Sequence, residues 1–236
     1  MYTVEGRIRY SETDEQKRLT IPGLINYFQD CSTFQSEDIG AGLAYMEELH
    51  MVWVLASWQV EIKRLPVLGE RIVVGTVPYD FKAFLGYRNF ILMTPEGETL
   101  CIANSLWSLL DTDTKRPVNT PTDMKAKYPL EKALEMDYAV RKIPLSEERQ
   151  GFPPFEVGPE HLDANHHVNN GKFISMAARY LSEGFQVSRL RAEYKKQAFL
   201  GDRIYPYVFC NEDSCVVSLE SEDKKPFVIV EFVKSV

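Results

Sequence analysis

Two distant stretches of this chain share one residue pattern, in the same order both times. Residues 61–72 (EIKRLPVLGERI) align with residues 193–204 (EYKKQAFLGDRI), with six of the twelve pairs identical and two more keeping their charge. Upstream, residues 14–20 (DEQKRLT) align with residues 163–169 (DANHHVN), and each is followed by an apolar run. A pattern that recurs in fixed order indicates a structural unit built more than once. The sequence therefore predicts two homologous units.

The spacing of the two alignments locates an insertion and the unit boundaries. Their offsets are 149 and 132 residues, so the first copy carries 17 additional residues between its motifs. The excess falls around residues 40–50, where a loop or a helix extension would hold it. A charge-dense segment that contains two prolines separates the copies and is typical of a linker. We predict domains at residues 1–124 and 151–236, joined by a linker at 125–150.

Each copy has the same predicted order of elements: a short strand, a turn, an apolar helix and long strands. The first helix is expected from Thr20, a good N-cap residue followed by Pro22 in the first turn, to about residue 40. The second is expected from Asn169 to about residue 183. The predicted strands lie at residues 2–9, 58–63, 71–78, 85–93 and 100–110, and at 154–157, 189–195, 205–209, 216–219 and 227–233.

The alternation of residues in the strands predicts the fold class. Apolar and polar residues alternate along residues 58–63 and 189–195, which is typical of antiparallel strands with one solvated face and one packed face. One apolar helix packed on a curved antiparallel sheet, built twice, is an α+β fold with segregated layers. This is the hot-dog arrangement. We therefore predict a double hot-dog of two tandem modules.

Composition and charge exclude several classes of protein. The chain has 236 residues, of which 44% are hydrophobic and 26% charged, as in ordinary globular proteins. Its net charge of −7 argues against a nucleic-acid surface. The longest uncharged apolar stretch, residues 51–58, is far shorter than the roughly 20 residues that span a bilayer. Charged residues at positions 5 and 7 interrupt any signal-peptide core. We expect a cytoplasmic protein without membrane insertion.

The four cysteines indicate no metal site. They form no CxxC pair and have no metal-ligand spacing. A disulfide between Cys210 and Cys215 across a hairpin is one interpretation. Four small buried hydrophobic residues is the preferred one, because cytosolic thiols stay reduced.

The densest polar cluster is at residues 161–173 (HLDANHHVNNGKF). If the segment is extended, Asp163, Asn165 and His167 share one side. That side would lie just before a helix whose first N–H groups have no partners within the helix. Such a set could polarise an acyl carbonyl, stabilise its oxyanion and activate water. The alternative is local capping, in which Asp163 and Asn165 form side-chain turns and His167 packs.

Comparison of the two copies favours the functional interpretation. The corresponding residues of the first copy are Asp14, Gln16 and Arg18, and an arginine stays charged, so it cannot act as an acid or a base. The asymmetry predicts a site in the second unit and an apolar-pocket role for the first. A metal site built from the nearby histidines is disfavoured, because adjacent side chains of an extended segment point apart.

The motif D-x-N-x-H-V-N-N-x-K-F at residues 163–173 resembles the active-site signature of the acyl-acyl-carrier-protein thioesterases, plant and bacterial fatty-acyl hydrolases with tandem hot-dog domains. Residues 10–29 and 51–69 are similar to the N-terminal segment and first long strand of that family. The resemblance implies hydrolysis of fatty acyl-acyl carrier protein, with no cofactor, and a catalytic role for Asp163, Asn165 and His167. No transit peptide is visible, so we expect a bacterial member.

One position departs from the family. An acidic residue on the following strand, often with a cysteine after it, is replaced here by Gln197 and Ala198. Ala198 excludes a cysteine nucleophile at that position. Gln197 can orient a water molecule but cannot accept its proton. The general base is then His167 or Asp163. The histidine is favoured because imidazole ordinarily titrates nearest neutrality.

The implied partner is an acyl carrier protein, which is itself acidic. A chain with a net charge of −7 needs a local basic face to bind it. The candidate docking residues are Lys172, Arg189, Arg191, Lys195 and Lys196. A solvated strand edge protected by lysines is the alternative. Neither the acyl chain length nor the pairing of two chains as a homodimer can be read from the pattern.

Two other functions stay open at this point. A hot-dog acyl-CoA thioesterase or hydratase would share the fold and differ in its substrate. A non-catalytic acyl-binding module would account for Gln197 and for the degenerate first copy.

Overall fold

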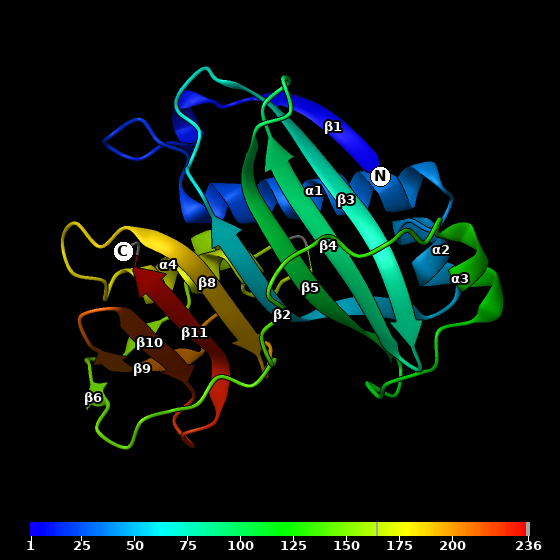
Figure 1. Cartoon of the computed structure of the whole chain (residues 1–236). Coiled ribbons are helices and arrows are strands. Elements are labelled where there is room, and N and C mark those ends of the chain that lie inside the picture. Colours follow the sequence, from blue (N-terminus) through cyan, green and yellow to red (C-terminus); the bar gives the residue numbers. More distant parts are fainter. Residues whose placement is uncertain (164, 235–236) are drawn as a thin grey trace. The chain divides into compact units, whose positions relative to one another are not determined.

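The computed structural model describes residues 1–163 and 165–234 (Figure 1). Its packing divides the chain into unit 1, residues 1–56 with 63–138, and unit 2, residues 57–62 with 139–236. Residues 125–138, which we assigned to a linker, therefore pack with unit 1. In chain order, the elements up to the end of unit 1 are β1 (Tyr2–Arg7), η1 (Tyr10–Glu12), α1 (Ile21–Asp38), α2 (Leu43–Glu48), β2 (Met51–Ile62), β3 (Arg71–Lys82), β4 (Leu85–Met93), β5 (Thr99–Asp111) and α3 (Thr122–Lys127).

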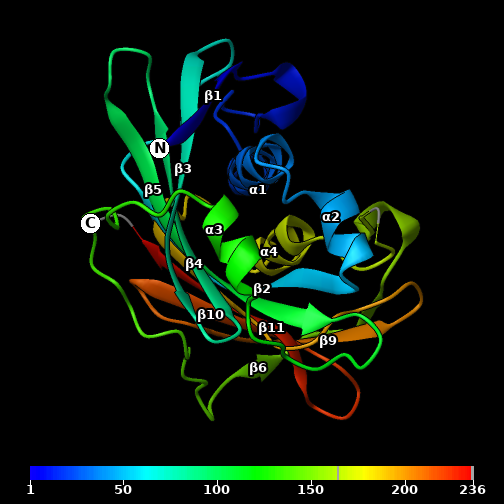
Figure 2. The ribbon, with the colours of Figure 1, turned by 90° about the vertical axis from the view of Figure 1, so that its right-hand side faces the viewer.

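Unit 1 is an antiparallel sheet with one long helix on it. Its strands are ordered β1-β3-β4-β5, and every neighbouring pair is antiparallel. Helix α1 packs against β1 and β3. Figure 1 shows α1 crossing behind the strands, and Figure 2 shows the same helix nearly end-on. This is the predicted arrangement of one helix against a curved sheet.

Helix α1 begins where its capping residues predict. The Thr20 hydroxyl oxygen accepts the Gly23 N–H at 3.2 Å, which satisfies one of the donors that a helix start leaves open. Leu24, Ile25 and Phe28 lie at helical spacing and are fully buried. Burial of each such side chain contributes about 1.5–3 kcal/mol, so this face holds α1 to the sheet.

Unit 2 repeats the plan with a shorter helix. It contains β6 (Gln150–Gly151), β7 (Phe155–Glu156), η2 (Pro159–His161), α4 (Asn170–Ala178), β8 (Val187–Tyr194), β9 (Arg203–Cys210), β10 (Ser214–Glu220) and β11 (Pro226–Lys234). Residues 57–61 of β2 pair with β8, and the order continues β8-β11-β10-β9, with both β6 and β7 on β9. Helix α4 packs on β10 and β11.

The two helices differ in length, which accounts for the insertion. Asn169 caps α4 by accepting the Gly171 N–H at 2.8 Å, but α4 has 9 residues and ends before the predicted residue 183. Helix α1 has 18 residues and is followed by α2. The additional residues of the first copy are therefore a helix extension and a short second helix, as the spacing of the repeat indicated.

The polar face of the β2–β8 pair is solvated only in part, which differs from our prediction. Gln59 and Glu193 are only 5% and 2% exposed. The chain that follows Tyr138 lies over them: the Ala139 N–H donates to Gln59 Oε1 at 2.8 Å, and the Ile143 N–H donates to Glu193 Oε2 at 3.2 Å. We call residues 139–151 the strap. The alternation of apolar and polar residues did indicate strands with one polar face. Gln59 and Glu193 on that face are covered by the strap, a segment whose composition is typical of a linker.

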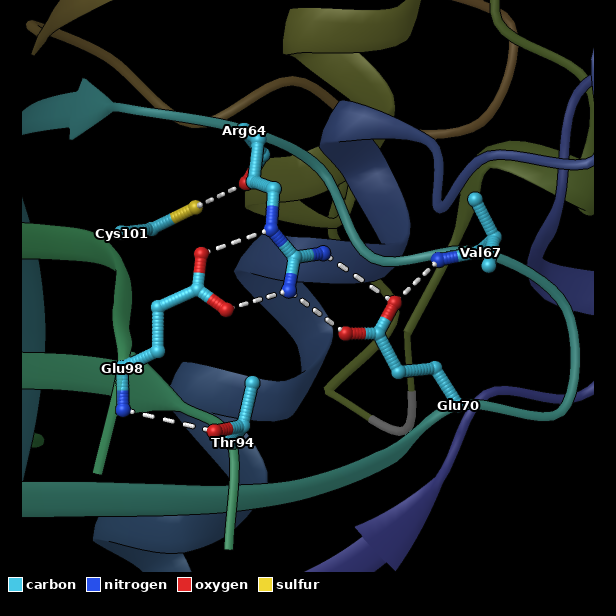
Figure 3. A network of polar contacts seen from close by, with 6 residues as sticks. All are labelled: Arg64, Val67, Glu70, Thr94, Glu98 and Cys101. Carbon is cyan, nitrogen blue, oxygen red and sulfur yellow. Dashed lines mark hydrogen bonds and ion pairs between the residues drawn. The ribbon is translucent and has the colours of Figure 1, made fainter. Parts of the chain in front are cut away.

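A charged clasp holds the connection between β2 and β3 in unit 1 (Figure 3). The Arg64 guanidinium lies between the carboxylates of Glu70 and Glu98, with Nη2 donating to them at 2.8 and 2.7 Å. Glu70 Oε2 also accepts the Val67 N–H at 2.9 Å. The forked geometry of arginine suits such two-sided binding. These hydrogen bonds from Arg64 lower the pKa of both carboxyl groups.

Unit 2 keeps only part of this clasp. The carboxylate of Asp202, which aligns with Glu70, accepts the Phe199 N–H at 2.9 Å, as Glu70 does for Val67. The aligned cation is Lys196, whose ammonium lies 5.1 Å from the centre of the Phe227 ring. Within the described residues, Lys196 forms no ion pair of the kind that Arg64 makes. The Gln197–Leu200 segment is thus held less firmly than its counterpart in unit 1.

The cysteines divide into two kinds. Cys31 and Cys101 are buried and form no disulfide, as predicted. Cys210 and Cys215 face each other across β9 and β10 and are joined as a disulfide, so the hairpin alternative is the one that the structure shows.

Candidate functional site

Residues 163 and 165–167 of the motif belong to a tight turn, so the extended conformation that we considered does not occur there. Leu162 and Val168 form a β-bridge, the Asp163 N–H donates to the His167 carbonyl at 2.9 Å, and the His166 N–H donates to the Asp163 carbonyl at 3.0 Å. The carboxylate of Asp163 closes the turn by accepting the N–H groups of Asn165 and His167 at 2.8 and 3.4 Å. Short acidic side chains commonly stabilise turns in this way.

The same turn occurs in unit 1. Asp14 Oδ1 accepts the Arg18 N–H at 2.8 Å, and the Asp14 N–H donates to the Arg18 carbonyl, also at 2.8 Å. Lys17 and His166, which align, both have a positive φ, 61° and 60°. Asp163 therefore has a structural role that both copies share. For this residue the local-capping interpretation describes the observed contacts.

The side chains on the two turns behave differently. In unit 1, Arg18 Nη2 donates to Gln16 Oε1 at 3.3 Å, and its Nε lies 3.5 Å from the Asp14 carboxylate. In unit 2, the Asn165 carboxamide and the ring nitrogens of His167 form no hydrogen bond with any described residue. The turn of unit 1 thus closes on itself, whereas the turn of unit 2 leaves an amide and an imidazole available to a ligand.

Each turn is anchored to the segment after a long strand. The Leu19 N–H donates to the Pro66 carbonyl at 2.8 Å, and the Val168 N–H donates to the Ala198 carbonyl at 2.9 Å. The two donors are 149 residues apart in the chain and the two acceptors are 132 residues apart. These are the two offsets of the sequence alignment. They also place exposed Gln197, which precedes Ala198, beside the 163–167 turn.

Phe199 is a site neighbour that the sequence analysis missed. Its ring centre lies 4.9 Å from that of His167 in an edge-on arrangement, and the residue is 48% exposed together with Leu200 at 60%. Aromatic pairs favour this geometry. The sequence does place two large apolar residues, Phe199 and Leu200, in the turn after β8. Only the fold shows that Phe199 contacts His167.

The expected helix-start donors are already used. The Gly171 N–H donates to the Asn169 side chain at 2.8 Å, and the N–H groups of Lys172 and Phe173 donate to the Asn169 carbonyl at 2.9 and 3.2 Å. These three groups do not bind a substrate carbonyl in this conformation, contrary to our expectation. The Asn165 carboxamide is a donor at this position that forms no hydrogen bond with a described residue.

The five predicted docking cations differ in exposure, since Arg189 and Arg191 are only partly exposed. Arg191 binds the Glu231 carboxylate through two nitrogens, at 2.7 and 3.1 Å, and its side chain is only 12% exposed. Arg189 lies two residues away on the same side of β8, opposite the side that packs toward α4. We therefore remove both arginines from the proposed docking set. Lys172, Lys195 and Lys196 are exposed.

Among the described residues, no group of three or more His, Cys, Asp and Glu side chains is arranged to hold a metal ion. Across residues 1–163 and 165–234, no helix has the length and hydropathy needed to cross a membrane.

Comparison with solved structures defines the class of fold. An acyl-ACP thioesterase from Bacteroides thetaiotaomicron superposes with a TM-score of 0.88 at 20% identity, covering 99% of this chain and 97% of that one. A putative oleoyl thioesterase from Lactobacillus plantarum gives 0.87 at 20% identity, covering 98% and 94%. The chain is thus a double hot-dog protein, as predicted.

Comparison of sequences defines the family. A model described as the acyl-ACP thioesterase N-terminal domain matches residues 1–128. The oleoyl-acyl carrier protein thioesterases 1 and 2 of Arabidopsis thaliana, both chloroplastic, are 27% and 23% identical over 71% and 92% of this chain. The chain spans 51% and 61% of the length of these two relatives. It belongs to the acyl-ACP thioesterase family.

Proposed function

We propose that this chain hydrolyses the thioester of a fatty acyl group on acyl carrier protein, at the 163–167 turn of unit 2, and releases a free fatty acid. One observation carries the site. The same turn is built in both units, but only in unit 2 do its amide and imidazole side chains have no hydrogen-bond partner among the described residues. Family membership and the names of the relatives support the substrate class.

The geometry suggests a division of roles. The Asn165 carboxamide donates to the carbonyl oxygen of the thioester, and His167 accepts a proton from the attacking water. The tetrahedral oxyanion then collapses, the carbon–sulfur bond breaks, and His167 returns the proton to the leaving thiolate. Asp163 holds the turn. Its Oδ1 already accepts two N–H groups, which favours His167 over Asp163 as the base.

Gln197 is proposed to orient the attacking water from the exposed segment beside the turn. We expect Gln197→Glu to raise kcat/KM for acyl-ACP severalfold, because a carboxylate can accept the proton that an amide cannot. The measurement is the rate of free-thiol release. Gln197→Ala is the control and should lower the rate. A Gln197→Glu variant no faster than wild type would show that no acidic group is missing here.

The carrier is proposed to dock on the basic side of unit 2, at Lys172, Lys195 and Lys196. Lys195 is 40% exposed and also pairs with Glu193, its Nζ lying 2.5 Å from Oε1. Because an acidic carrier would be attracted to such a face, docking should weaken as salt screens the charges.

The function is tested by free-thiol release from matched acyl-ACP and acyl-CoA substrates of several chain lengths. We expect turnover of acyl-ACP, with a kcat/KM that falls with salt more steeply than for acyl-CoA. Faster turnover of acyl-CoA without that salt dependence would assign a CoA thioesterase instead. Tight acyl binding without any thiol release would indicate the non-catalytic binding module.

A further inference from the structure

Strand β1 leaves one edge of the sheet of unit 1 open. Among the described strands it pairs only with β3 (Figure 1). The Ile8 N–H, just past the end of β1, donates to the Glu70 carbonyl at 3.0 Å, so the backbone groups of Ile8 face the β3 side. Backbone groups point to opposite sides at successive residues of an antiparallel strand. The N–H and C=O groups of Thr3, Glu5 and Arg7 therefore point away from β3.

The groups on this open edge are accessible. Thr3, Glu5 and Arg7 are exposed, and none of their N–H groups has an acceptor within residues 1–163 and 165–234. The Arg7 carbonyl accepts the Tyr27 hydroxyl of α1 at 3.3 Å, so α1 lies on this side of β1. Unpaired donors and acceptors at strand spacing form a template on which another extended chain can pair.

A groove follows the open edge, between β1 and α1. Its volume is about 780 Å³, within the range of about 300–1,000 Å³ that is typical of binding sites. Residues 4–9 line one side, and Tyr27, Cys31 and Phe34 of α1 line the other. Phe34 and Leu68 are 48% and 38% exposed, so the groove offers apolar surface to a ligand. The open edge and the cavity are thus parts of one feature.

The repeated fold does not require this edge. The corresponding strand of unit 2, β7, has 2 residues, whereas β1 has 6. Proteins usually keep edge strands very short or cover them, because an open edge invites pairing. Among the described strands, a long open edge beside a groove is therefore a property of unit 1 that the shared fold does not explain.

We propose that the open edge of β1 binds an extended peptide segment of another protein, which adds an antiparallel strand to the sheet of unit 1. Main-chain hydrogen bonds to Thr3, Glu5 and Arg7 supply affinity, and alternate side chains of the peptide supply specificity. The peptide residues that face α1 occupy the groove beside Phe34 and Leu68. This site belongs to unit 1 and does not depend on the hydrolysis proposed at the 163–167 turn.

The charges of β1 determine which peptide fits. An antiparallel strand places the residue opposite Arg7 two positions before the residue opposite Glu5. Opposite charges on neighbouring strands attract and like charges repel, so this order selects an acidic residue followed two positions later by a basic one. The side chains of β1 at Val4 and on the face that includes Gly6 are half-buried, and the peptide residues opposite them face the groove. The expected motif is acidic, apolar, basic, apolar.

Fluorescence polarisation of a labelled peptide with the full chain tests the site. The probe, acetyl-Ser-Glu-Val-Lys-Val-Thr-Ser-amide, has the expected order of charges. A second peptide with its Glu and Lys exchanged has the same composition. We expect the probe to bind at least about fivefold more tightly than the exchanged peptide, in which both cross-strand charge pairs are repulsive. Equal affinities, or no binding of the probe, would overturn the proposal.

N-methylation of the probe separates main-chain pairing from side-chain attraction. Methyl groups on the Glu and Lys nitrogens block the two N–H groups that point at β1, and this peptide should bind at least about tenfold more weakly. Methyl groups on the two Val nitrogens, which point away from β1, provide the matched control and should change the affinity far less. Equal weakening by the two modifications would contradict strand addition.

Variants of the chain test the same contacts from the protein side. Glu5→Pro removes an N–H that points away from β3, so it should abolish peptide binding and keep the wild-type Tm. Glu5→Lys combined with Arg7→Glu should reverse the preference between the two peptides, and this result decides the matter even if Glu5→Pro fails to fold. Glu96→Lys, an exposed change in the turn after β4, should leave the preference unchanged. Full probe affinity in a folded Glu5→Pro variant would place the peptide elsewhere.

A second copy of this chain is the competing occupant of the open edge. Sedimentation of the wild type and of Glu5→Pro distinguishes the two. A wild type that is monomeric at the concentrations of the binding assay supports the peptide as the occupant. A dimer that Glu5→Pro converts to a monomer would assign the edge to self-association and overturn the proposal.

Discussion

His167→Ala should lower kcat/KM for acyl-ACP by about a hundredfold or more, because it removes the imidazole that packs against Phe199 in the 163–167 turn. Asn165→Ala should lower kcat by about 100- to 1000-fold, the usual effect of removing one oxyanion donor. Both variants should keep the wild-type Tm, since neither side chain makes a hydrogen bond to a described residue. Free-thiol release and thermal unfolding provide the two readouts.

The repeat supplies matched controls for this experiment. Arg18→Ala and Gln16→Ala alter the aligned positions of unit 1, so they should leave kcat/KM near the wild-type value. Asp163→Asn keeps an oxygen that can accept the N–H groups of the turn, and it should be milder than Asp163→Ala. Near-wild-type rates for both His167→Ala and Asn165→Ala would place the chemistry elsewhere.

Arg149→Met should destabilise the protein by about 3–5 kcal/mol, the cost of leaving a buried charge without its partner. Arg149 lies on the strap, forms an ion pair with Glu220 of β10, and lies 5.1 Å from the centre of the Tyr207 ring. The Glu220 side chain is only 1% exposed, and its Oε2 has no hydrogen bond. Thermal and urea unfolding measure the loss, which corresponds to a fall in Tm of roughly 10 °C.

Two variants separate the buried charge from other effects. Arg149→Met combined with Glu220→Met should recover most of the lost stability, since no charge is then left buried. Arg141→Met removes a second strap cation, but the buried Glu193 keeps Lys195 and the Ile143 N–H as partners. Its cost should stay below about 1 kcal/mol. Equal losses for Arg149→Met and Arg141→Met would contradict this account of the strap.

Those features of the fold that depend on neighbours in the chain could be predicted. Thr20 and Asn169 begin their helices as N-caps, and the aligned segments after β2 and β8 contact the aligned turns in both units. The location of the candidate site stays a prediction, whereas the extended geometry considered for it differs from the turn that the structure shows. An extended segment and a turn closed by Asp163 are both compatible with the sequence of residues 163–167. What decides between them is the set of backbone hydrogen bonds to Asp163 and the anchor at Ala198.

The sequence by itself determined that this protein is duplicated, that each copy pairs a helix with an antiparallel sheet, and that the copies differ at Asn165 and His167. Periodicity and repetition are properties of the chain, so they are visible in the order of residues. Only the tertiary structure decided that the strap covers Gln59 and Glu193 and that Arg191 binds Glu231. Burial and the pairing of charges depend on residues far apart in the chain, and the order of residues does not show which of these come together.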